Sequence, residues 1–320
     1  MAAFLIRTFG ILLMLTALAV ALSRAPDRPV QTLVARWAPP PSDFVEVKGQ
    51  VVHLRDEGPR HDGEGTPPPI VLIHGTSASL HTWEGWVRAL KGQRRVISFD
   101  LPGFGLTGPF GGQYAPDDYR GETYAAFVLD LLDALQLKRV VLGGNSLGGE
   151  IAWRTALRAP QRLAGLVLVD ALGPAFTPEQ VPLGFTIAAV PVLGRISEHL
   201  LPRALVAQSV RQVYGQPGKV NDELVDRYFE ITLREGNRRA LGLRLQQLTL
   251  GEGAEHVATL RLPTLILWGG RDRLVPPAIG RWFHERIAGS RLVVFDELGH
   301  VPQEEDPART VAELKAFLGP

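Results

Sequence analysis

Short apolar runs recur along most of the chain, separated by segments in which apolar residues return every three or four positions. The first two runs, residues 44–47 and 50–55, flank Lys48-Gly49 and predict a β-hairpin. The later runs are continuous, which is typical of strands buried on both faces of a sheet. These runs are residues 70–73, 95–99, 140–142, 166–169, 265–268 and 292–295.

Helical periodicity between these runs completes an alternation of strand and helix. Residues 123–135 and 150–157 are examples. Such an alternation predicts an α/β fold with a mostly parallel central sheet and helices on both faces. Parallel sheets carry their chemistry at the carboxyl ends of the strands, so the residues that follow each run are the candidates for function.

One long interval breaks the alternation and suggests the domain organisation. Residues 173–260 are too many for a plain loop, and residues 221–248 within them have a helical pattern. We therefore expect a helical insertion within one core domain. The expected divisions are an N-terminal hydrophobic helix at 1–23, a linker at 24–42, the first part of the core at 43–172, the insertion at 173–260 and the second part of the core at 261–320.

The N-terminal segment carries no charge from Thr8 to Ser23. Phe4, Leu5 and Ile6 extend its apolar run upstream, with Arg7 between the two parts. A membrane anchor needs about 20 mainly apolar residues. A cleaved signal peptide needs an apolar stretch of roughly 7–15 residues with small residues at the cut, which Ala21 and Ser23 supply. We expect a single-pass anchor in the cell membrane, with the folded domain outside the cytoplasm. Secretion or periplasmic release after cleavage is the alternative.

Composition excludes several classes of function. The formal net charge is +1 and the basic residues are scattered, so a nucleic-acid partner is not expected. The chain has no cysteine, which excludes disulfides and thiol nucleophiles. No spacing of histidines and acids suggests a metal site, and we expect neither a metal nor a cofactor. Oligomeric state stays open.

A Gly-x-Ser-x-Gly motif, Gly144-Asn145-Ser146-Leu147-Gly148, lies between a predicted strand and a predicted helix. A sharp strand–turn–helix bend needs glycines for close backbone approach, and it exposes the serine hydroxyl. The N-terminus of the following helix favours negative charge that develops nearby. We therefore predict that Ser146 is a nucleophile.

A serine nucleophile needs a base, and the base needs a carboxylate that orients it. His300 follows the last apolar run and is the predicted base. Asp272, after the run at 265–268, is the predicted carboxylate, and Asp170, after the run at 166–169, is the competitor. The order nucleophile, acid and base along the chain is that of the α/β-hydrolases.

Acyl transfer also needs N–H donors for the oxyanion, and the substrate needs a pocket. The backbone N–H of Leu147 is one expected donor, and the loop after residues 70–73 supplies the second, for which we choose Thr76. The expected pocket residues are His81, Asn145 and Val301.

Four motifs together resemble the α/β-hydrolase superfamily over about residues 43–320. They are His74-Gly75-Thr76, the segment from Asp100 to Gly105, the segment from Gly144 to Gly148, and Gly269 to Asp272 with Gly299-His300. The chain is similar to the branch that holds epoxide hydrolases, haloalkane dehalogenases, haloperoxidase-like esterases and meta-cleavage C–C hydrolases. Epoxide hydrolases and dehalogenases have an aspartate nucleophile where this chain has Ser146.

The resemblance implies a helical cap over the active site and hydrolysis of an ester or lactone of a mainly hydrophobic small molecule, through an acyl-enzyme and without a cofactor. Gly144-Asn145-Ser146 is similar to the meta-cleavage C–C hydrolases, whereas Ser77-Ala78-Ser79 and Val301 depart from them. C–C hydrolysis is therefore an alternative. An acyltransferase that uses the same residues, and a non-catalytic small-molecule receptor, are two others.

Overall fold

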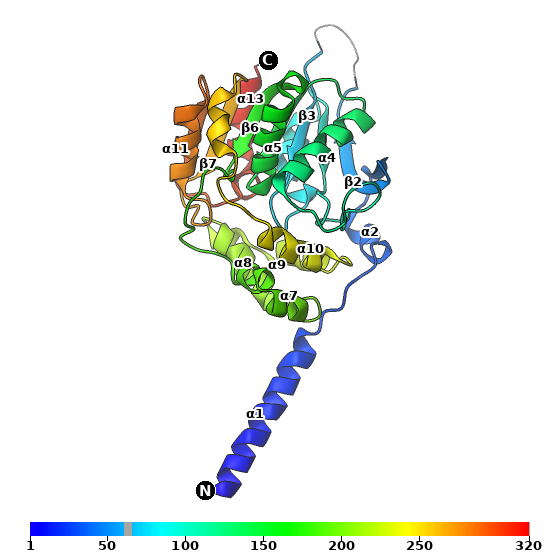
Figure 1. The fold of residues 1–320 in the computed structure, drawn as a ribbon, viewed down its shortest axis with the longest axis vertical. Coiled ribbons are helices and arrows are strands. Elements are labelled where there is room, and N and C mark those ends of the chain that lie inside the picture. The colour runs from blue at the N-terminus through cyan, green and yellow to red at the C-terminus, as the bar shows by residue number, and fades with distance from the viewer. Residues whose placement is uncertain (61–65, 320) are drawn as a thin grey trace.

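The computed structural model describes residues 1–60 and 66–319, and an eight-stranded sheet lies at its centre (Figure 1). The strands are β1 (Ser42–Val47), β2 (Gln50–Glu57), β3 (Ile70–Ile73), β4 (Val96–Phe99), β5 (Val140–Asn145), β6 (Leu163–Val169), β7 (Thr264–Gly269) and β8 (Arg291–Phe295). Their order is β1-β2-β4-β3-β5-β6-β7-β8. Only the pairings β1–β2 and β2–β4 are antiparallel within the described residues. The predicted fold class is confirmed.

Strand register brings the ends of the central strands to one edge of the sheet. Ile73 of β3 pairs with Phe99 of β4 and with Gly144 of β5, and Gly144 pairs with Leu168 of β6. The residues that directly follow these strands therefore form a row along that edge. Because all four residues of β3 and of β4 are buried, the continuous apolar runs are explained by burial on both faces.

Thirteen α-helices and four short 3₁₀ segments surround the sheet in the described residues. The α-helices are α1 (Ala2–Ser23), α2 (Gln31–Trp37), α3 (Glu84–Leu90), α4 (Gly121–Ala134), α5 (Leu147–Arg158), α6 (Leu183–Ala189), α7 (Pro191–Ser197), α8 (Arg203–Val213), α9 (Asp222–Thr232), α10 (Asn237–Gln246), α11 (Pro277–Arg286), α12 (Pro302–Glu305) and α13 (Pro307–Leu318). The 3₁₀ segments are Leu80–Trp83, Pro160–Arg162, Pro217–Lys219 and Ala254–Thr259. Helices α4, α5 and α11 pack on one face of the sheet, and α3 and α13 pack on the other.

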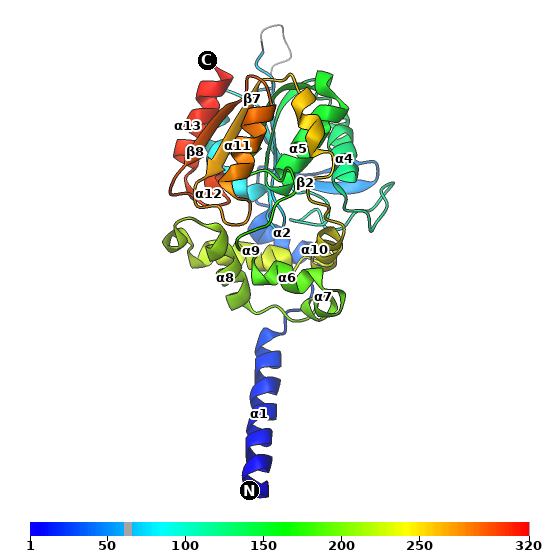
Figure 2. The same cartoon turned by 60° about the vertical axis from the view of Figure 1, so that its left-hand side comes forward.

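Helices α6 to α10 form a separate layer, which we call the cap. They come between β6 and β7 in the chain and lie across one end of the core (Figures 1 and 2). Their place in the chain falls within the predicted insertion at residues 173–260. A small apolar cluster of α8 and α9 side chains, which includes Val210 and Val225, packs against Val301 of the core.

The N-terminal helix α1 projects away from the cap (Figure 2). A search of the described residues finds no helix with the length and apolarity needed to cross a membrane, so the expected single-pass span is not confirmed. The segment expected as a linker differs from a free tether, because it contains α2. Leu33 and Trp37 of α2 are buried in a cluster with Leu106 and Ile231.

Close backbone approach between two loops predicts the effect of a single methyl group. A Cβ at Gly269 would collide with the carbonyl oxygen of Gly299, so we expect Gly269→Ala to destabilise the fold by about 3 kcal/mol. Gly92→Ala is the control, because a Cβ there meets no atom within 4 Å, and we expect a change within about 0.5 kcal/mol. Urea unfolding of both variants checks this. Equal stabilities would contradict the close packing of the loops after β7 and β8.

Candidate active site

Ser146 lies at the sharp turn from β5 into α5, in a backbone conformation that non-glycine residues rarely adopt. Its φ is +56°, and the turn is held from both sides. The Ser146 N–H donates to the Val169 carbonyl at 3.0 Å, and the Leu172 N–H donates to the Ser146 carbonyl at 3.1 Å. Strained residues of this kind cluster at functional sites when the surrounding structure fixes them.

The glycines of the motif allow this turn because backbone crosses backbone there. A Cβ at Gly144 would collide with the Gly148 carbonyl, and a Cβ at Gly148 would collide with the Ile73 carbonyl. The start of α5 therefore crosses the ends of β5 and β3 at a spacing that admits only glycine. This explains in physical terms why the sequence motif has glycine on both sides of the serine.

His300 and Asp272 form a buried hydrogen-bonded pair on the loops after β8 and β7. His300 Nδ1 lies 2.6 Å from Asp272 Oδ2, and both side chains are shielded from solvent. The other oxygen, Asp272 Oδ1, accepts from the N–H groups of Leu274 at 2.8 Å and Val275 at 2.9 Å. Since a carboxylate accepts at Nδ1, we assign the proton to Nδ1, which leaves Nε2 as an acceptor.

The His300 backbone is fixed from two directions. Its N–H donates to the Val213 carbonyl of the cap at 2.7 Å. Its carbonyl accepts from Asn145 Nδ2 at 2.9 Å. Asn145, which sequence analysis assigned only to the pocket, thus joins the histidine loop to the residue next to Ser146.

Ser146 and His300 line one cavity between core and cap, and Asn145, Val301 and Thr76 line it as well. In the described part of the chain, no hydrogen bond joins Ser146 Oγ to His300 Nε2. Such hydrogen bonds are often long before substrate binds and tighten afterwards. The geometry therefore brings the hydroxyl and the imidazole to the same wall without a direct bond.

The loop after β3 lies directly against the serine turn. A Cβ at Gly75 would lie 3.0 Å from Asn145 Oδ1 and 3.1 Å from the Ser146 Cβ. In the described residues, neither the Thr76 N–H nor the Leu147 N–H has an acceptor in the protein. Two free N–H groups beside a serine hydroxyl suit the stabilisation of an oxyanion.

His74 shapes this loop and is uncharged. The Leu101 N–H donates to His74 Nε2 at 3.0 Å, so Nδ1 carries the proton and donates to the Gly75 carbonyl at 2.7 Å. Burial lowers the pKa of His74 and keeps the ring neutral. Beneath it, Asp100 accepts from the Leu80 and Leu106 N–H groups, each at 2.7 Å.

His81, expected to line the pocket, lies outside the cavity. Its Nε2 is 2.8 Å from the Trp37 carbonyl, and its Nδ1 is 3.0 Å from Ser79 Oγ. Burial lowers the pKa of His81 to about 3, so the ring is neutral and holds α2 against the loop after β3. The pocket assignment is corrected: the ring contacts the Trp37 carbonyl of α2 through Nε2 and Ser79 of its own loop through Nδ1.

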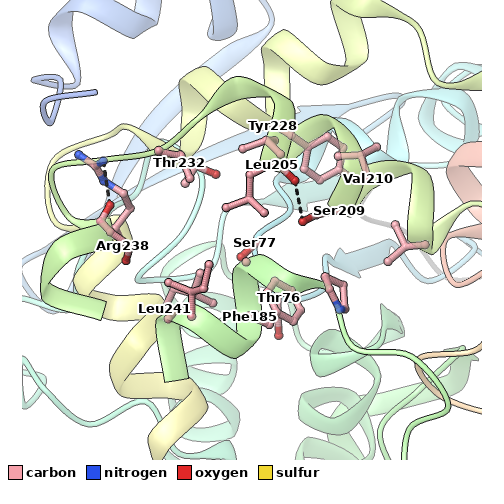
Figure 3. Close-up of a pocket in the computed structure, with 18 of the residues that line it drawn as sticks. Thr76, Ser77, Phe185, Leu205, Ser209, Val210, Tyr228, Thr232, Arg238 and Leu241 are labelled. Atoms are coloured by element: carbon pink, nitrogen blue, oxygen red, sulfur yellow. Dashed lines mark hydrogen bonds between the residues drawn. The ribbon is translucent and has the colours of Figure 1, made fainter. Parts of the chain in front are cut away.

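The cavity has a volume of about 460 Å³, and cap side chains supply most of its wall. Figure 3 shows Leu205, Val210 and Tyr228 facing Phe185 and Leu241 across it. Sequence analysis named none of these residues. For Phe185, Leu205 and Val210 the only signal in the sequence is that residues 181–213 are rich in Leu, Val, Ile and Ala; Tyr228 and Leu241 lie outside that stretch.

Two glutamates of α12 tie the cap to the loop that carries His300. Glu304 accepts from the hydroxyls of Tyr228 at 2.9 Å and Tyr214 at 3.0 Å, and it also pairs with Arg227. Glu305 accepts from three backbone N–H groups, those of residues 215, 216 and 299. Cap position and histidine position are therefore coupled through these carboxylates.

Asp170, the competing carboxylate, is buried beside Asp272. Its Oδ1 accepts from the Gly269 N–H at 2.9 Å. Burial and the neighbouring Asp272 carboxylate raise the pKa of Asp170 well above its usual range. Asp170, Asp272 and His300 bring ligand atoms within 4.8 Å of one another, a spacing that also suits a metal ion. Because His300 Nδ1 is bonded to Asp272, we interpret the cluster as a hydrogen-bonded row in which Asp170 holds a proton.

Comparison with known proteins places this chain in a family. The model of the Alpha/beta hydrolase family matches residues 70–314. A 2-hydroxy-6-oxo-2,4-heptadienoate hydrolase of Pseudomonas putida is 30% identical over 270 residues, which cover 79% of this chain and 90% of that protein.

Two solved structures are similar along the chain. The meta-cleavage product hydrolase of Pseudomonas fluorescens IP01 has a TM-score of 0.72 and 25% identity, over 86% of this chain and 96% of that one. A bacterial membrane phospholipase A has a TM-score of 0.67 and 25% identity, over 99% of this chain and 96% of that one.

The raised pKa of Asp170 predicts a pH dependence of stability. A carboxyl whose pKa is raised in the folded state stabilises the fold most at low pH, and this stability is lost as pH rises toward the raised value. Asparagine keeps the acceptor for Gly269 and cannot ionise. We therefore expect the free energy of unfolding of Asp170→Asn, relative to the natural protein, to increase from pH 5 to pH 9.

Urea unfolding across this pH range makes the measurement. Asp222→Asn is the control, since the Asp222 side chain is 88% exposed, and we expect a change within about 0.5 kcal/mol at every pH. A difference between Asp170→Asn and the natural protein that stays constant with pH would show that Asp170 is ionised throughout.

Proposed function

The chain belongs to the alpha/beta hydrolase family, and we propose that it is a serine hydrolase that cleaves a carboxylic ester or lactone of a mainly hydrophobic small molecule. The observation that carries this proposal is the buried 2.6 Å pair of His300 and Asp272, on the wall of an apolar cavity that Ser146 also lines. A base held by a carboxylate on the same cavity wall as a serine is the arrangement that activates a hydroxyl.

In the proposed mechanism, His300 Nε2 takes the proton of Ser146 as Oγ attacks the carbonyl carbon. The N–H groups of Thr76 and Leu147 hold the oxyanion, and each such donor stabilises the transition state by about 3 kcal/mol. Asp272 stabilises the imidazolium, which then protonates the leaving alcohol. Water repeats the sequence with the acyl-enzyme and releases the acid, so that no cofactor takes part.

The residues that line the cavity favour binding of an apolar acyl or alkyl group. Its cationic side chain, Arg238, is not available to a ligand, because its Nη2 lies 2.5 Å from Asp27 Oδ1 and its Nη1 donates to the Ser197 carbonyl. An ester with an uncharged chain fits such a wall. The similar phospholipase is consistent with an acyl ester substrate.

C–C bond hydrolysis is the second candidate, because the similar P. putida enzyme acts on a 2-hydroxy-6-oxo-2,4-heptadienoate. That substrate carries a carboxylate, for which the paired Arg238 leaves no free cation in the described lining of the cavity. The ester therefore remains the preferred substrate class.

For localisation, we propose that the protein is attached to a cell membrane with its hydrolase domain outside the cytoplasm. Release after signal cleavage is the alternative. What supports attachment is α1, whose side chains from residue 4 to residue 18 are all exposed and mostly apolar.

The first prediction concerns the nucleophile. We expect Ser146→Ala to lower kcat/KM for p-nitrophenyl butyrate by at least about 10⁴-fold, since the acyl-enzyme then has no oxygen to form on. The unfolding curve should stay unchanged. Ser290→Ala is the matched control, because its hydroxyl contacts His284 near the surface, and it should keep full activity. Activity retained in Ser146→Ala would exclude the mechanism.

The second prediction concerns chain length. With p-nitrophenyl esters from acetate to decanoate, we expect kcat/KM to rise with length until the cavity is filled. Each buried methylene can add up to about 0.8 kcal/mol of binding, or nearly fourfold. A steady decline from acetate onward would show that the cavity does not receive the acyl chain.

A further inference from the structure

Helix α1 is apolar around its whole circumference and exposed on every side. The exposed fractions are 72% for Phe4, 61% for Leu12 and 64% for Met14. Its two threonines donate to carbonyls of the same helix, Thr8 to Phe4 at 3.0 Å and Thr16 to Leu12 at 2.8 Å. Between residues 4 and 18, Arg7 is therefore the described side chain whose polar group has no partner within the helix.

The chain directly after α1 is clamped to the cap by backbone hydrogen bonds. The Leu201 N–H donates to the Ser23 carbonyl at 2.9 Å, and the Ala25 N–H donates to the His199 carbonyl at 3.0 Å. Further along, the Arg28 N–H donates to the Leu233 carbonyl at 2.6 Å. With the root of the helix held in this way, α1 and the cap have a fixed relation to each other.

Asp27 adds an ion pair to this clamp, and its own side chain is 37% exposed. Its carboxylate receives two bonds from Arg238, whose side chain is only 3% exposed, and one from the Gly236 N–H at 3.1 Å. Because the Arg238 guanidinium is buried, opening the clamp would leave that cation without its carboxylate partner. The segment from residue 24 to residue 28 therefore fixes α1 to the cap.

An apolar patch lies on the cap next to the root of α1. We call Val190, Val192, Leu193 and Ile196 the cap patch; their exposed fractions run from 43% to 70%. They belong to α7 and the residue before it, and Figure 2 shows α7 at the end of the cap from which α1 leaves. Exposed apolar patches of this kind mark interaction sites.

The cap patch is also part of the cavity wall. Leu193 and Ile196 line the cavity that contains Ser146, together with Leu200 and Leu201 beside the clamp. The wall next to α1 is therefore apolar both outside and inside. One exposed cation, Arg195, lies on α7 between Leu193 and Ile196, and it can bind a polar headgroup while an apolar chain enters the cavity.

We propose that α1 and the cap patch form one lipid-binding surface, and that the cavity takes the acyl chain of a membrane lipid ester directly from it. The choice of a lipid ester as substrate rests on the proposed function, whereas the binding of α1 and the cap patch to lipid does not depend on it. Hydrolysis would break the bond between the acyl carbon and the ester oxygen. Water would supply the hydroxyl of the released fatty acid and the proton of the released alcohol.

A lipid surface fits these features better than a second copy of the chain. A partner helix covers one stripe of α1, whereas α1 is apolar on all sides. A lipid phase surrounds an inserted helix and also meets the patch at its root. Arg7 can reach polar headgroups with its long side chain.

The test uses the full chain and vesicles of phosphatidylcholine. We expect the protein to float with the vesicles, and we expect the double variant Leu12→Asp, Leu13→Asp to remain in solution. We expect the folded domain to be undisturbed, because Leu12 and Leu13 are 61% and 62% exposed on α1. Flotation of the double variant to the same extent would overturn the role of α1.

The cap patch is tested by hydrolysis of the vesicle lipid itself, measured as released fatty acid. Val192→Asp is the variant, because Val192 is 70% exposed and does not line the cavity. We expect its rate of fatty-acid release from vesicles to fall about tenfold, since burial of one valine side chain in lipid strengthens binding by about that factor. Val51→Asp is the matched control, with a valine 54% exposed on β2, and should keep the natural rate. Equal rates of fatty-acid release by Val192→Asp and Val51→Asp would overturn the role of the cap patch in lipid binding.

A water-soluble ester separates this proposal from the enzymatic one. On p-nitrophenyl butyrate, we expect Val192→Asp to stay within about twofold of the natural protein, because a surface valine outside the cavity does not touch the reacting atoms. If the natural protein floats with the vesicles but hydrolyses no ester, the proposed function is overturned and the lipid-binding surface is not. Dimers that depend on Leu12 and Leu13, formed without any vesicle binding, would identify a second copy as the occupant and overturn the lipid surface.

Discussion

The 2.6 Å hydrogen bond between His300 and Asp272 depends on the parallel pairing of β7 with β8. In this register Gly269 is opposite Phe295, so the loops that leave the two strands run side by side. The absence of a side chain at Gly269 lets these loops approach to backbone contact at Gly299. The base and its carboxylate meet because the sheet aligns the ends of two consecutive parallel strands, β7 and β8.

Around this pair, buried polar groups are placed so that few charges remain uncompensated. Neutral His74 and His81 contact carbonyls of the loop after β3 and of α2, and burial beside Asp272 raises the pKa of Asp170. Glu304 binds the cap through two tyrosines and an arginine. Glu304 follows His300 by four residues in the chain, so a shift of the cap would also move the loop that holds the His300 imidazole.

The sheet could be predicted well from the sequence, because strands buried on both faces leave continuous apolar runs. All eight strands were expected at or within a few residues of their observed places. The serine turn was predictable because backbone crossing demands glycine at residues 144 and 148. Ser146, Asp272 and His300 were chosen by their positions after strands, and the structure brings Asp272 and His300 into contact.

The structures of the cap and of the N-terminal segment were harder to predict from the sequence, because contacts between residues far apart in the chain determine them. His81 turns toward the Trp37 carbonyl, a residue 44 positions away, and no local pattern signals that bond. The Pro-rich stretch after Ser23 looks like a free tether, yet hydrogen bonds to Leu201 and His199 fix it to the cap. The cavity wall likewise comes from helices whose packing depends on the whole cap.

The most direct test of the account is covalent labelling by a fluorophosphonate, followed by mass spectrometry of the peptides. We expect one adduct, on Ser146, and a labelling rate that falls by at least about 10³-fold in His300→Ala, because the serine then has no base. An adduct on another residue, or an unchanged rate in His300→Ala, would contradict the claim that these loops build one nucleophilic site.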